Sequence, residues 1–339
     1  MNRLRYILIL AIAIVSVGCS RDAGTYKDTR VIMATYVTIT ADRSGLPEDK
    51  VIAAVNSGFA EITRVDNLMS VYKPESQLSL INAGSGAMPV KADPEVIDCI
   101  EKSVRVSELT GGSFDTTVGP LVKLWKIGSD AAHVPDAADI DRAKALVDYR
   151  KIVIDRAAGT VFLKQKGMSV DLGGIAKGYS ADRAVEALKK AGIRGAVVSV
   201  AGDIKAFGTR PDGKPWKVGV QHPRDKSAVI AEVALKDEAV STSGDYERYF
   251  RKAGKRYSHI IDPRTGYPVQ KGLISVTVVA KESWSADAMG KLFVLGPEEA
   301  YQLALAHPEI EVLMVDKDGK TYATGRFRDM NVGPVKVGE

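Results

Sequence analysis

The sequence contains few of the residues that build zinc sites or disulfide frameworks. Its 339 residues include two cysteines, Cys19 and Cys99, which lie far apart, and four histidines. A zinc site made of clustered Cys and His side chains is therefore a poor explanation of this chain. Carboxylates and carbonyls are plentiful, so the composition allows a site for a metal that prefers oxygen ligands, such as Mg²⁺.

Several common functional signatures are also missing. The net charge is only +5, and the basic residues are scattered without a long Lys/Arg run, which argues against a nucleic-acid partner. The GxGxxG, Walker A, GxSxG and HExxH motifs are absent, so the usual nucleotide-binding and hydrolase templates receive no support.

The N-terminus predicts export. Arg3 and Arg5 precede an apolar run over residues 6–17, which is shorter than the roughly 20 residues that a membrane-spanning helix needs. Residues 16–19 resemble a bacterial lipobox in which Ser16 replaces the usual Leu. We expect a lipoprotein signal peptide over residues 1–18, lipidation of Cys19, and a periplasm-facing protein on the inner or outer membrane. The alternative is an uncleaved N-terminal anchor.

The rest of the chain alternates between strand and helix patterns. Residues 19–29 are polar and predict a tether, and residues 30–339 predict one compact α+β or mixed α/β unit in which helices flank β-sheets. Apolar residues at helical spacing predict helices over 46–70 and 93–112. Residues 29–41 predict one strand or two short ones joined near Ala34, and residues 151–164 predict a hairpin.

The stretch over residues 170–192 combines a carboxylate, a glycine turn and a helix start. Asp171 precedes Gly173 and Gly174, and an amphipathic helix follows. Glycine lets the backbone approach a ligand, and the first N–H groups of a helix point toward an anion. The stretch predicts a site for a polyanionic ligand and its metal, although an ordinary strand-to-helix turn explains these residues equally well.

Polar residues next to glycine recur in three further segments, over residues 113–120, 241–250 and 258–266. Loops of this kind often converge on one pocket. Within the last segment His259 lies between Ser258 and Asp262, which fits a general base, although a structural histidine on a strand is the commoner case. Asp171, Asp262 and Asp287 are candidate metal ligands.

Eight segments in order resemble the ApbE family of flavin transferases, which move FMN from FAD onto a Thr or Ser of target proteins. The segments are MATYVTIT, SVYKPESQLSLIN, GGSFDTTVGPLVKLW, VDLGGIAKGYSADRAVE, VSVAGDIKAFG, TSGDYERYF, YSHIIDPRTGYP and SADAMGKLFVLG. Together they cover nearly all of the chain after residue 30. The resemblance implies an ApbE-like fold with the ligand site between two lobes.

The resemblance also implies roles for individual residues. His259 would be the catalytic base, with Asp262 beside it. Gly174 and Asp287 would bind Mg²⁺, and Lys291 stands where the family usually has a Thr metal ligand, so it would oppose the metal or take over part of its charge. The residues expected to line the FAD site are Met33, Tyr72, Ser113, Phe114, Asp115, Asp171, Lys177, Ile260 and Ile261.

The resemblance therefore implies a Mg²⁺-dependent FAD:protein FMN transferase that releases AMP. Its acceptors would be periplasm-facing proteins of membrane electron-transfer complexes of the Rnf or Nqr type. Two alternatives are a Mg²⁺-dependent FAD pyrophosphatase, which yields FMN and AMP, and a flavin-binding lipoprotein without catalysis.

Overall fold

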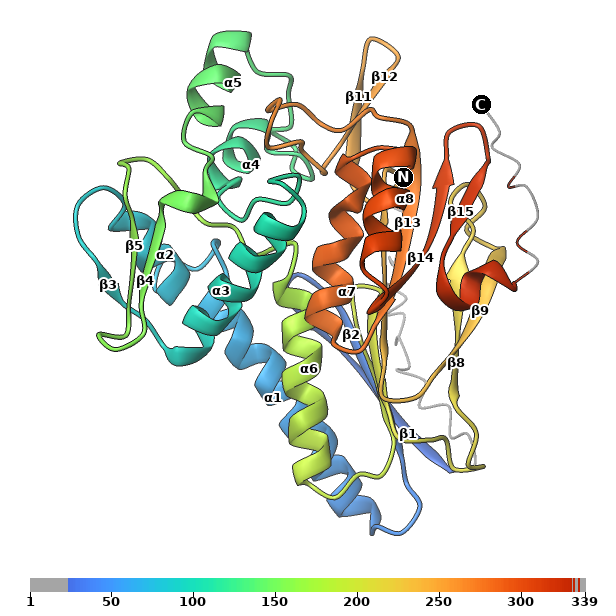
Figure 1. The fold of residues 1–339 in the computed structure, drawn as a ribbon. Coiled ribbons are helices and arrows are strands. Elements are labelled where there is room, and N and C mark those ends of the chain that lie inside the picture. Colours follow the sequence, from blue (N-terminus) through green and yellow to red (C-terminus); the bar gives the residue numbers. More distant parts are fainter. Residues whose placement is uncertain (1–23, 331, 333–334, 336–339) are drawn as a thin grey trace, which may run out of the picture.

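The structure, a computed structural model, describes residues 24–330, Val332 and Val335. The predicted signal peptide and Cys19 lie outside these residues. Among the described residues, helices pack against an eight-stranded sheet (Figure 1), which confirms the predicted α+β class. None of the helices in this part of the chain is both long and apolar enough to cross a membrane.

The large sheet is antiparallel throughout. Each strand is hydrogen-bonded to its neighbours in the order β1-β2-β6-β7-β10-β13-β14-β15. The strands are β1 (Thr25–Ile32), β2 (Thr35–Asp42), β6 (Ala196–Val200), β7 (Asp203–Phe207), β10 (Ala239–Gly244), β13 (Leu273–Ala280), β14 (Ile310–Asp316) and β15 (Thr321–Ala323).

Helices cover one face of this sheet and a two-stranded ribbon covers the other (Figure 1). The first layer consists of α1 (Glu48–Met69), α6 (Ala176–Lys190) and α7 (Ser283–Met289), and the ribbon consists of β8 (Trp216–Gln221) and β9 (Val229–Leu235). Every residue of β13 is buried because the strand is covered on both faces. Val278 packs in the core under the helices, whereas Val279 packs against the ribbon side.

The helix α1 follows directly from its sequence pattern. The five apolar residues at helical spacing, Val51, Val55, Phe59, Ile62 and Val65, are all buried. Burying such a side chain contributes about 1.5–3 kcal/mol. The face they form packs on α6 and on the β2–β6 part of the sheet.

A smaller lobe comes from the middle of the chain. It contains the sheet β3-β5-β4, of β3 (Val90–Lys91), β4 (Ile152–Asp155) and β5 (Thr160–Leu163), so the predicted hairpin over 151–164 is confirmed. Its helices are α2 (Gln77–Ala83), α3 (Pro94–Leu109), α4 (Gly119–Trp125) and α5 (Ala137–Lys144). The largest apolar core includes residues of both lobes, such as Val96 and Val278.

The ribbon of β11 (Tyr249–Lys252) and β12 (Lys255–Ser258) extends from the large sheet toward the smaller lobe (Figure 1). Tyr257 and Trp125 are in ring contact, with centroids 5.8 Å apart, and the Trp125 indole N–H donates to the Gly266 carbonyl at 2.9 Å. These contacts hold the segment that contains His259 against the smaller lobe. After α7 come a 3₁₀ helix (Gly290–Val294), α8 (Pro297–Ala306), β14 and β15, and a further 3₁₀ helix (Gly325–Arg328) follows β15.

The sequence pattern misplaced one boundary. Residues 25–29, predicted as the end of the tether, belong to β1, where they pair with residues 38–42 of β2. The strand β1 lies at the edge of the sheet, and its residues are exposed or half-buried. Its side chains can therefore be polar, and such a polar sequence also predicts a tether. The division near Ala34 is confirmed, since Met33 and Ala34 form the turn between β1 and β2.

Candidate functional site

The turn before α6 brings two distant segments together. The backbone N–H of Gly173 donates to the Asp171 carboxylate at 2.7 Å, and the N–H of Asp171 donates to the Thr116 carbonyl at 2.8 Å. Burial raises the pKa of Asp171 above its ordinary value. The turn is therefore fixed by its own aspartate and by the segment over residues 113–120.

Gly174 lies where no larger residue fits without movement. A Cβ atom at this position would lie 3.1 Å from the Phe114 ring and 3.4 Å from Cε of Lys291. The missing side chain lets the smaller lobe and the segment after α7 meet at the start of α6. The groups that approach Gly174 closely are thus protein groups on both sides, and the approach of a ligand to this turn stays a prediction.

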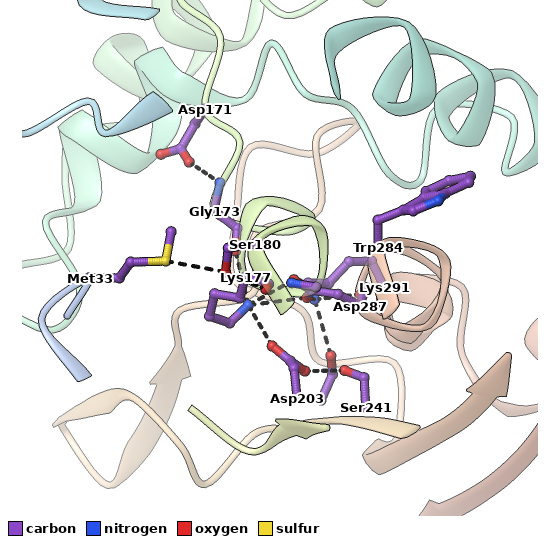
Figure 2. Close-up of polar contacts among 12 residues, drawn as sticks. Met33, Asp171, Gly173, Lys177, Ser180, Asp203, Ser241, Trp284, Asp287 and Lys291 are labelled. Atoms are coloured by element: carbon purple, nitrogen blue, oxygen red, sulfur yellow. Dashed lines mark hydrogen bonds and ion pairs between the residues drawn. The ribbon is translucent and has the colours of Figure 1, made fainter. Parts of the chain in front are cut away.

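Four charged side chains form the centre of the site, which we call the ion-pair cluster: Lys177, Asp203, Asp287 and Lys291 (Figure 2). Nζ of Lys177 lies 3.0 Å from Asp203 Oδ2 and 3.0 Å from Asp287 Oδ2. Nζ of Lys291 donates to Asp287 Oδ1 at 3.2 Å. The cluster joins α6, the start of β7, α7 and the 3₁₀ helix that follows α7, and some of these elements are far apart in sequence.

Asp287 also lies at the N-terminus of α6. Its Oδ2 accepts a hydrogen bond from the Gly178 backbone N–H at 3.3 Å. A helix N-terminus favours a negative charge, and here a carboxylate of α7 supplies it. A Cβ atom at Gly178 would lie 2.2 Å from the Ser283 carbonyl oxygen, so glycine is what lets α6 and α7 approach this closely.

Two serine hydroxyls of β10 also contact the cluster, and Figure 2 shows one of them, Ser241, beside Asp203. Ser241 donates to the Asp203 carboxylate, and the Lys291 ammonium donates to the Ser243 hydroxyl at 3.2 Å. A Cβ atom at Gly290 would lie 2.7 Å from Ser243 Oγ, so this glycine lets α7 end directly above the strand.

The neighbouring charges and burial shift the pKa values of three members of the cluster. Burial opposes ionisation of Asp287, but the neighbouring Lys177 and Lys291 outweigh it and lower the pKa of Asp287 below its ordinary value. Burial raises the pKa of Asp203, and the negative charge of Asp287 raises it further. Burial opposes the charge of Lys177, but Asp203 and Asp287 outweigh it and raise the pKa of this lysine.

His259 is half-buried and close enough to the cluster to sense its charge. Burial lowers its pKa to about 4, and the positive charges of Lys291 and Arg248 act in the same direction. Its ring Nδ1 lies 3.3 Å from the Arg248 carbonyl oxygen, and its backbone N–H donates to the same oxygen at 2.9 Å. His259 is therefore uncharged at neutral pH, as a base must be.

Asp262, predicted beside the His259 base, contacts Arg264 and Lys271. Its buried carboxylate accepts from the Arg264 backbone N–H at 2.9 Å and from the Arg264 Nε at 3.0 Å, and Lys271 lies 3.4 Å away. The His259 ring instead contacts the Arg248 carbonyl. Asp262 holds the turn over residues 262–266 and thereby the segment that carries His259.

The other residues predicted to line the FAD site occupy contrasting environments. Tyr72 is 84% exposed, and Met33 lies in the β1–β2 turn with its sulfur 3.7 Å from the Ser180 hydroxyl. The Asp115 carboxylate accepts from Thr117 and from the Tyr149 backbone N–H. The remaining four, Ser113, Phe114, Ile260 and Ile261, are buried.

Sequence reasoning missed Asp203 and the two serines of the cluster. Asp203 follows the Ala201-Gly202 turn between β6 and β7, and it is buried beside Lys177. The signal available in the sequence was an acidic residue directly after a buried strand and a glycine turn. Ser241 and Ser243 belong to the segment over residues 241–250, which the sequence placed among the polar segments expected to converge on a pocket, but neither serine was singled out.

The oxygen donors near Asp287 do not fit the Mg²⁺ site that the resemblance implies. Within residues 24–330, no group of three or more His, Cys, Asp or Glu side chains is placed to hold a metal ion. Mg²⁺ prefers six oxygen ligands in near-octahedral geometry. Lys291, predicted at a ligand position, contributes an ammonium that has no lone pair and that already contacts Asp287. Gly174 and Asp287 remain the only oxygen donors among the three predicted ligands.

The fold and the site together define a class of protein. An antiparallel sheet, a smaller helical lobe and a polar cluster at a helix N-terminus form a site suited to a phosphate-bearing ligand, with an uncharged histidine beside it. The chain belongs to the ApbE family, whose sequence model matches residues 33–314.

Relatives with assigned activities support this assignment over most of the chain. The FAD:protein FMN transferase of Escherichia coli K12 is 32% identical over 330 residues, which cover 94% of each chain. The crystal structure of the ApbE protein of Thermotoga maritima is 32% identical, with a TM-score of 0.82 over 90% of this chain and 98% of that one. The flavin transferase ApbE of Vibrio cholerae is 30% identical, with a TM-score of 0.79 over 90% and 99%.

Proposed function

We propose that this chain is an FAD:protein FMN transferase. The observation that carries the proposal is the uncharged His259 beside the ion-pair cluster, in a chain of the ApbE family. A relative that matches 94% of this chain carries the name of this activity. A base and fixed positive charges are the groups that transfer of a phosphoryl-linked flavin to a hydroxyl requires.

In the proposed reaction the hydroxyl oxygen of an acceptor Thr or Ser attacks the phosphorus on the FMN side of FAD. A new P–O bond forms, the bond from that phosphorus to the bridging oxygen breaks, and AMP leaves with the bridging oxygen. His259 takes the hydroxyl proton. The acceptor retains FMN through a phosphoester bond, so atoms and charge balance without an oxidant or reductant.

The proposed FAD site includes Met33, Tyr72, Ser113, Phe114, Asp115, Asp171, Lys177, Ile260 and Ile261. The exposed ring of Tyr72 is free to stack on a flat ligand. The Asp115 carboxylate is used inside the protein, so it would act by fixing the loop rather than by touching FAD. Lys177 is the cation of this set, and its ammonium also contacts the Gly173 carbonyl at 3.3 Å.

Mg²⁺ stays a prediction from the resemblance, which assigns it to Asp287 and the Gly174 carbonyl. A divalent ion there would stabilise negative charge on the leaving phosphate. Lys177 and Lys291 compete with it, because both ammonium groups already contact the Asp287 carboxylate.

We also propose that the protein is an exported lipoprotein, lipidated at Cys19, which acts in the periplasm on membrane electron-transfer proteins of the Rnf or Nqr type. The support for export and lipidation is the sequence of residues 1–19 alone, with its basic start, apolar run and lipobox-like end.

Incubation of the purified protein with FAD, Mg²⁺ and a Thr-bearing acceptor domain tests the proposed activity. We expect flavin fluorescence on the denatured acceptor and one AMP for each flavin attached. Release of FMN and AMP with no labelled acceptor would favour the pyrophosphatase. Bound and unaltered FAD would leave a flavin-binding lipoprotein.

A further inference from the structure

The Lys291 ammonium is surrounded by three oxygen atoms, as a bound metal cation would be. Its Nζ donates to Asp287 Oδ1 at 3.2 Å, to the Asp287 backbone carbonyl at 3.0 Å and to the Ser243 hydroxyl at 3.2 Å. An ammonium has three protons, and these three oxygens use all of them. Its side chain is 18% exposed, so the group is neither a solvated surface lysine nor fully removed from the site.

The stem of Lys291 lies along the glycine turn of α6. Its Cε would be 3.4 Å from a Cβ atom at Gly174. The ammonium is also close enough to His259 to lower the pKa of that histidine. Lys291 therefore places a fixed positive charge near both features that the proposed reaction uses, the turn before α6 and the base.

The same contacts disfavour binding of a divalent metal ion at Asp287. Asp287 is in contact with two ammonium groups, on Lys177 and Lys291, and within residues 24–330 no cluster of three metal-binding side chains includes it. A divalent ion at Asp287 would have to displace one of these groups and would be repelled by the other. The nearby Asp203 is already paired with Lys177.

We propose that the Lys291 ammonium takes the place of a divalent cation in this chain, and that its positive charge stabilises the pyrophosphate of FAD at short range while its three protons stay on Asp287 and Ser243. The inference rests on the proposed function, because FAD is the anion it concerns. FAD binding and FMN transfer then proceed without added metal. Replacing Lys291 by a residue with a neutral oxygen ligand removes the built-in charge and frees Asp287 for a metal ion.

The test compares the full-length protein with Lys291→Thr and with Lys236→Thr, an exposed lysine on the loop after β9 that serves as the control. Metal is removed with EDTA. Protein-bound Mn²⁺ is then measured by equilibrium dialysis with and without FAD, and FAD affinity is measured by flavin fluorescence. Both measurements omit the acceptor, so they stay informative even if no transfer activity exists.

We expect the wild type and Lys236→Thr to bind FAD equally in EDTA and in Mg²⁺. Both should retain less than about 0.1 Mn²⁺ per chain, which is the occupancy of a site whose Kd is about tenfold above the free Mn²⁺ concentration. Lys291→Thr should bind about one Mn²⁺ with FAD present, and should lose at least about tenfold in FAD affinity in EDTA, a loss that Mg²⁺ restores. With an acceptor present, only this variant should require metal for transfer.

Stoichiometric Mn²⁺ on the wild type, or FAD binding by the wild type that requires Mg²⁺, would overturn the proposal. Lys291→Met serves as a second variant, because it keeps an unbranched stem and adds neither charge nor an oxygen ligand. It should lose FAD affinity in EDTA without rescue by Mg²⁺, and unchanged affinity in EDTA would also overturn the proposal. Thermal unfolding of each variant identifies a chain that has failed to fold.

Discussion

At the scale of single residues, the environment of His259 decides whether it can act as a base. Its imidazole is neutral at physiological pH because burial and the nearby charges of Lys291 and Arg248 disfavour the protonated form. A negatively charged ligand in the site would offset these charges and increase the proton affinity of the ring. The histidine is thus poised to accept a proton once the substrate is bound.

Replacing His259 by alanine should remove the base and leave the binding site. We expect FMN transfer to fall by about 10²–10⁴-fold, the usual contribution of a general base, while FAD affinity changes by less than about twofold. Transfer is measured as acceptor-bound flavin fluorescence. His133→Ala is the matched control, since His133 is exposed and its ring contacts a carbonyl of its own loop. Unchanged transfer in His259→Ala would refute the assignment.

The pH dependence follows from the same residue. A depressed histidine pKa means that the protonated, inactive form accumulates only as the pH falls through about 4. We therefore expect kcat/KM, which reports the free enzyme, to stay level from neutral pH down to about 5 and to fall below that. Circular dichroism at each pH separates this loss from acid unfolding. A fall already centred near the ordinary histidine pKa of about 6.5 would contradict the buried, charge-perturbed state.

At the scale of the elements, two tight hairpin turns contain an alanine with a positive φ, and one of these turns directly precedes Asp203 of the ion-pair cluster. Ala201 (φ 54°) and Gly202 (φ 89°) connect β6 to β7 and place Asp203 at the start of its strand. Ala253 (φ 49°) and Gly254 (φ 75°) connect β11 to β12 in the same way. A positive φ at both central residues is what this kind of two-residue turn requires, and alanine tolerates it poorly.

Substitution of Ala201 by glycine should therefore stabilise the protein. The relief of a left-handed alanine, about 1–2 kcal/mol, exceeds the entropic cost of glycine, about 0.5–1 kcal/mol. We expect the free energy of unfolding to rise by roughly 0.5–1 kcal/mol in urea titrations, and Ala253→Gly to behave alike. Ala138→Gly, at an exposed position of α5, should lower the free energy of unfolding, because glycine disfavours a helix. A lower midpoint for Ala201→Gly would show that the turn is not strained.

At the scale of the whole molecule, the site exists because distant parts of the chain meet. The ion-pair cluster comes from the first turn of α6, the β6–β7 hairpin and the α7 segment, and the bend after β12 supplies His259. The smaller lobe closes the site through Phe114 at Gly174. Gly174, Gly178 and Gly290 allow contacts that a larger side chain would disrupt.

The proposed membrane attachment depends on the N-terminal segment over residues 1–19, which lies outside the residues that the structure describes. We expect Cys19→Ser to abolish incorporation of radiolabelled palmitate, because serine has no thiol to bind the lipid. The variant should keep its flavin transfer activity, since the site lies in a separate part of the chain. Palmitate incorporation by Cys19→Ser would contradict the predicted lipidation.

The sequence by itself determined the fold class, the family and most of the site segments. Helical spacing of apolar residues predicted α1 and α3, and strand patterns predicted β4, β5 and the β1–β2 division, because amphipathic periodicity is local information. The order of eight motifs identified the ApbE family, which the family comparison confirms.

Only the tertiary structure decided which of these residues act together. Asp203, Ser241 and Ser243 joined the cluster through pairing of β7 with β10, and Asp262 was seen to hold a turn through Arg264. The resemblance implied that Lys291 would oppose a metal or take over part of its charge, and the tertiary structure shows its ammonium among three oxygens of Asp287 and Ser243. Long-range contacts set the burial and the electrostatic field of each group, and neither quantity is present in the local sequence.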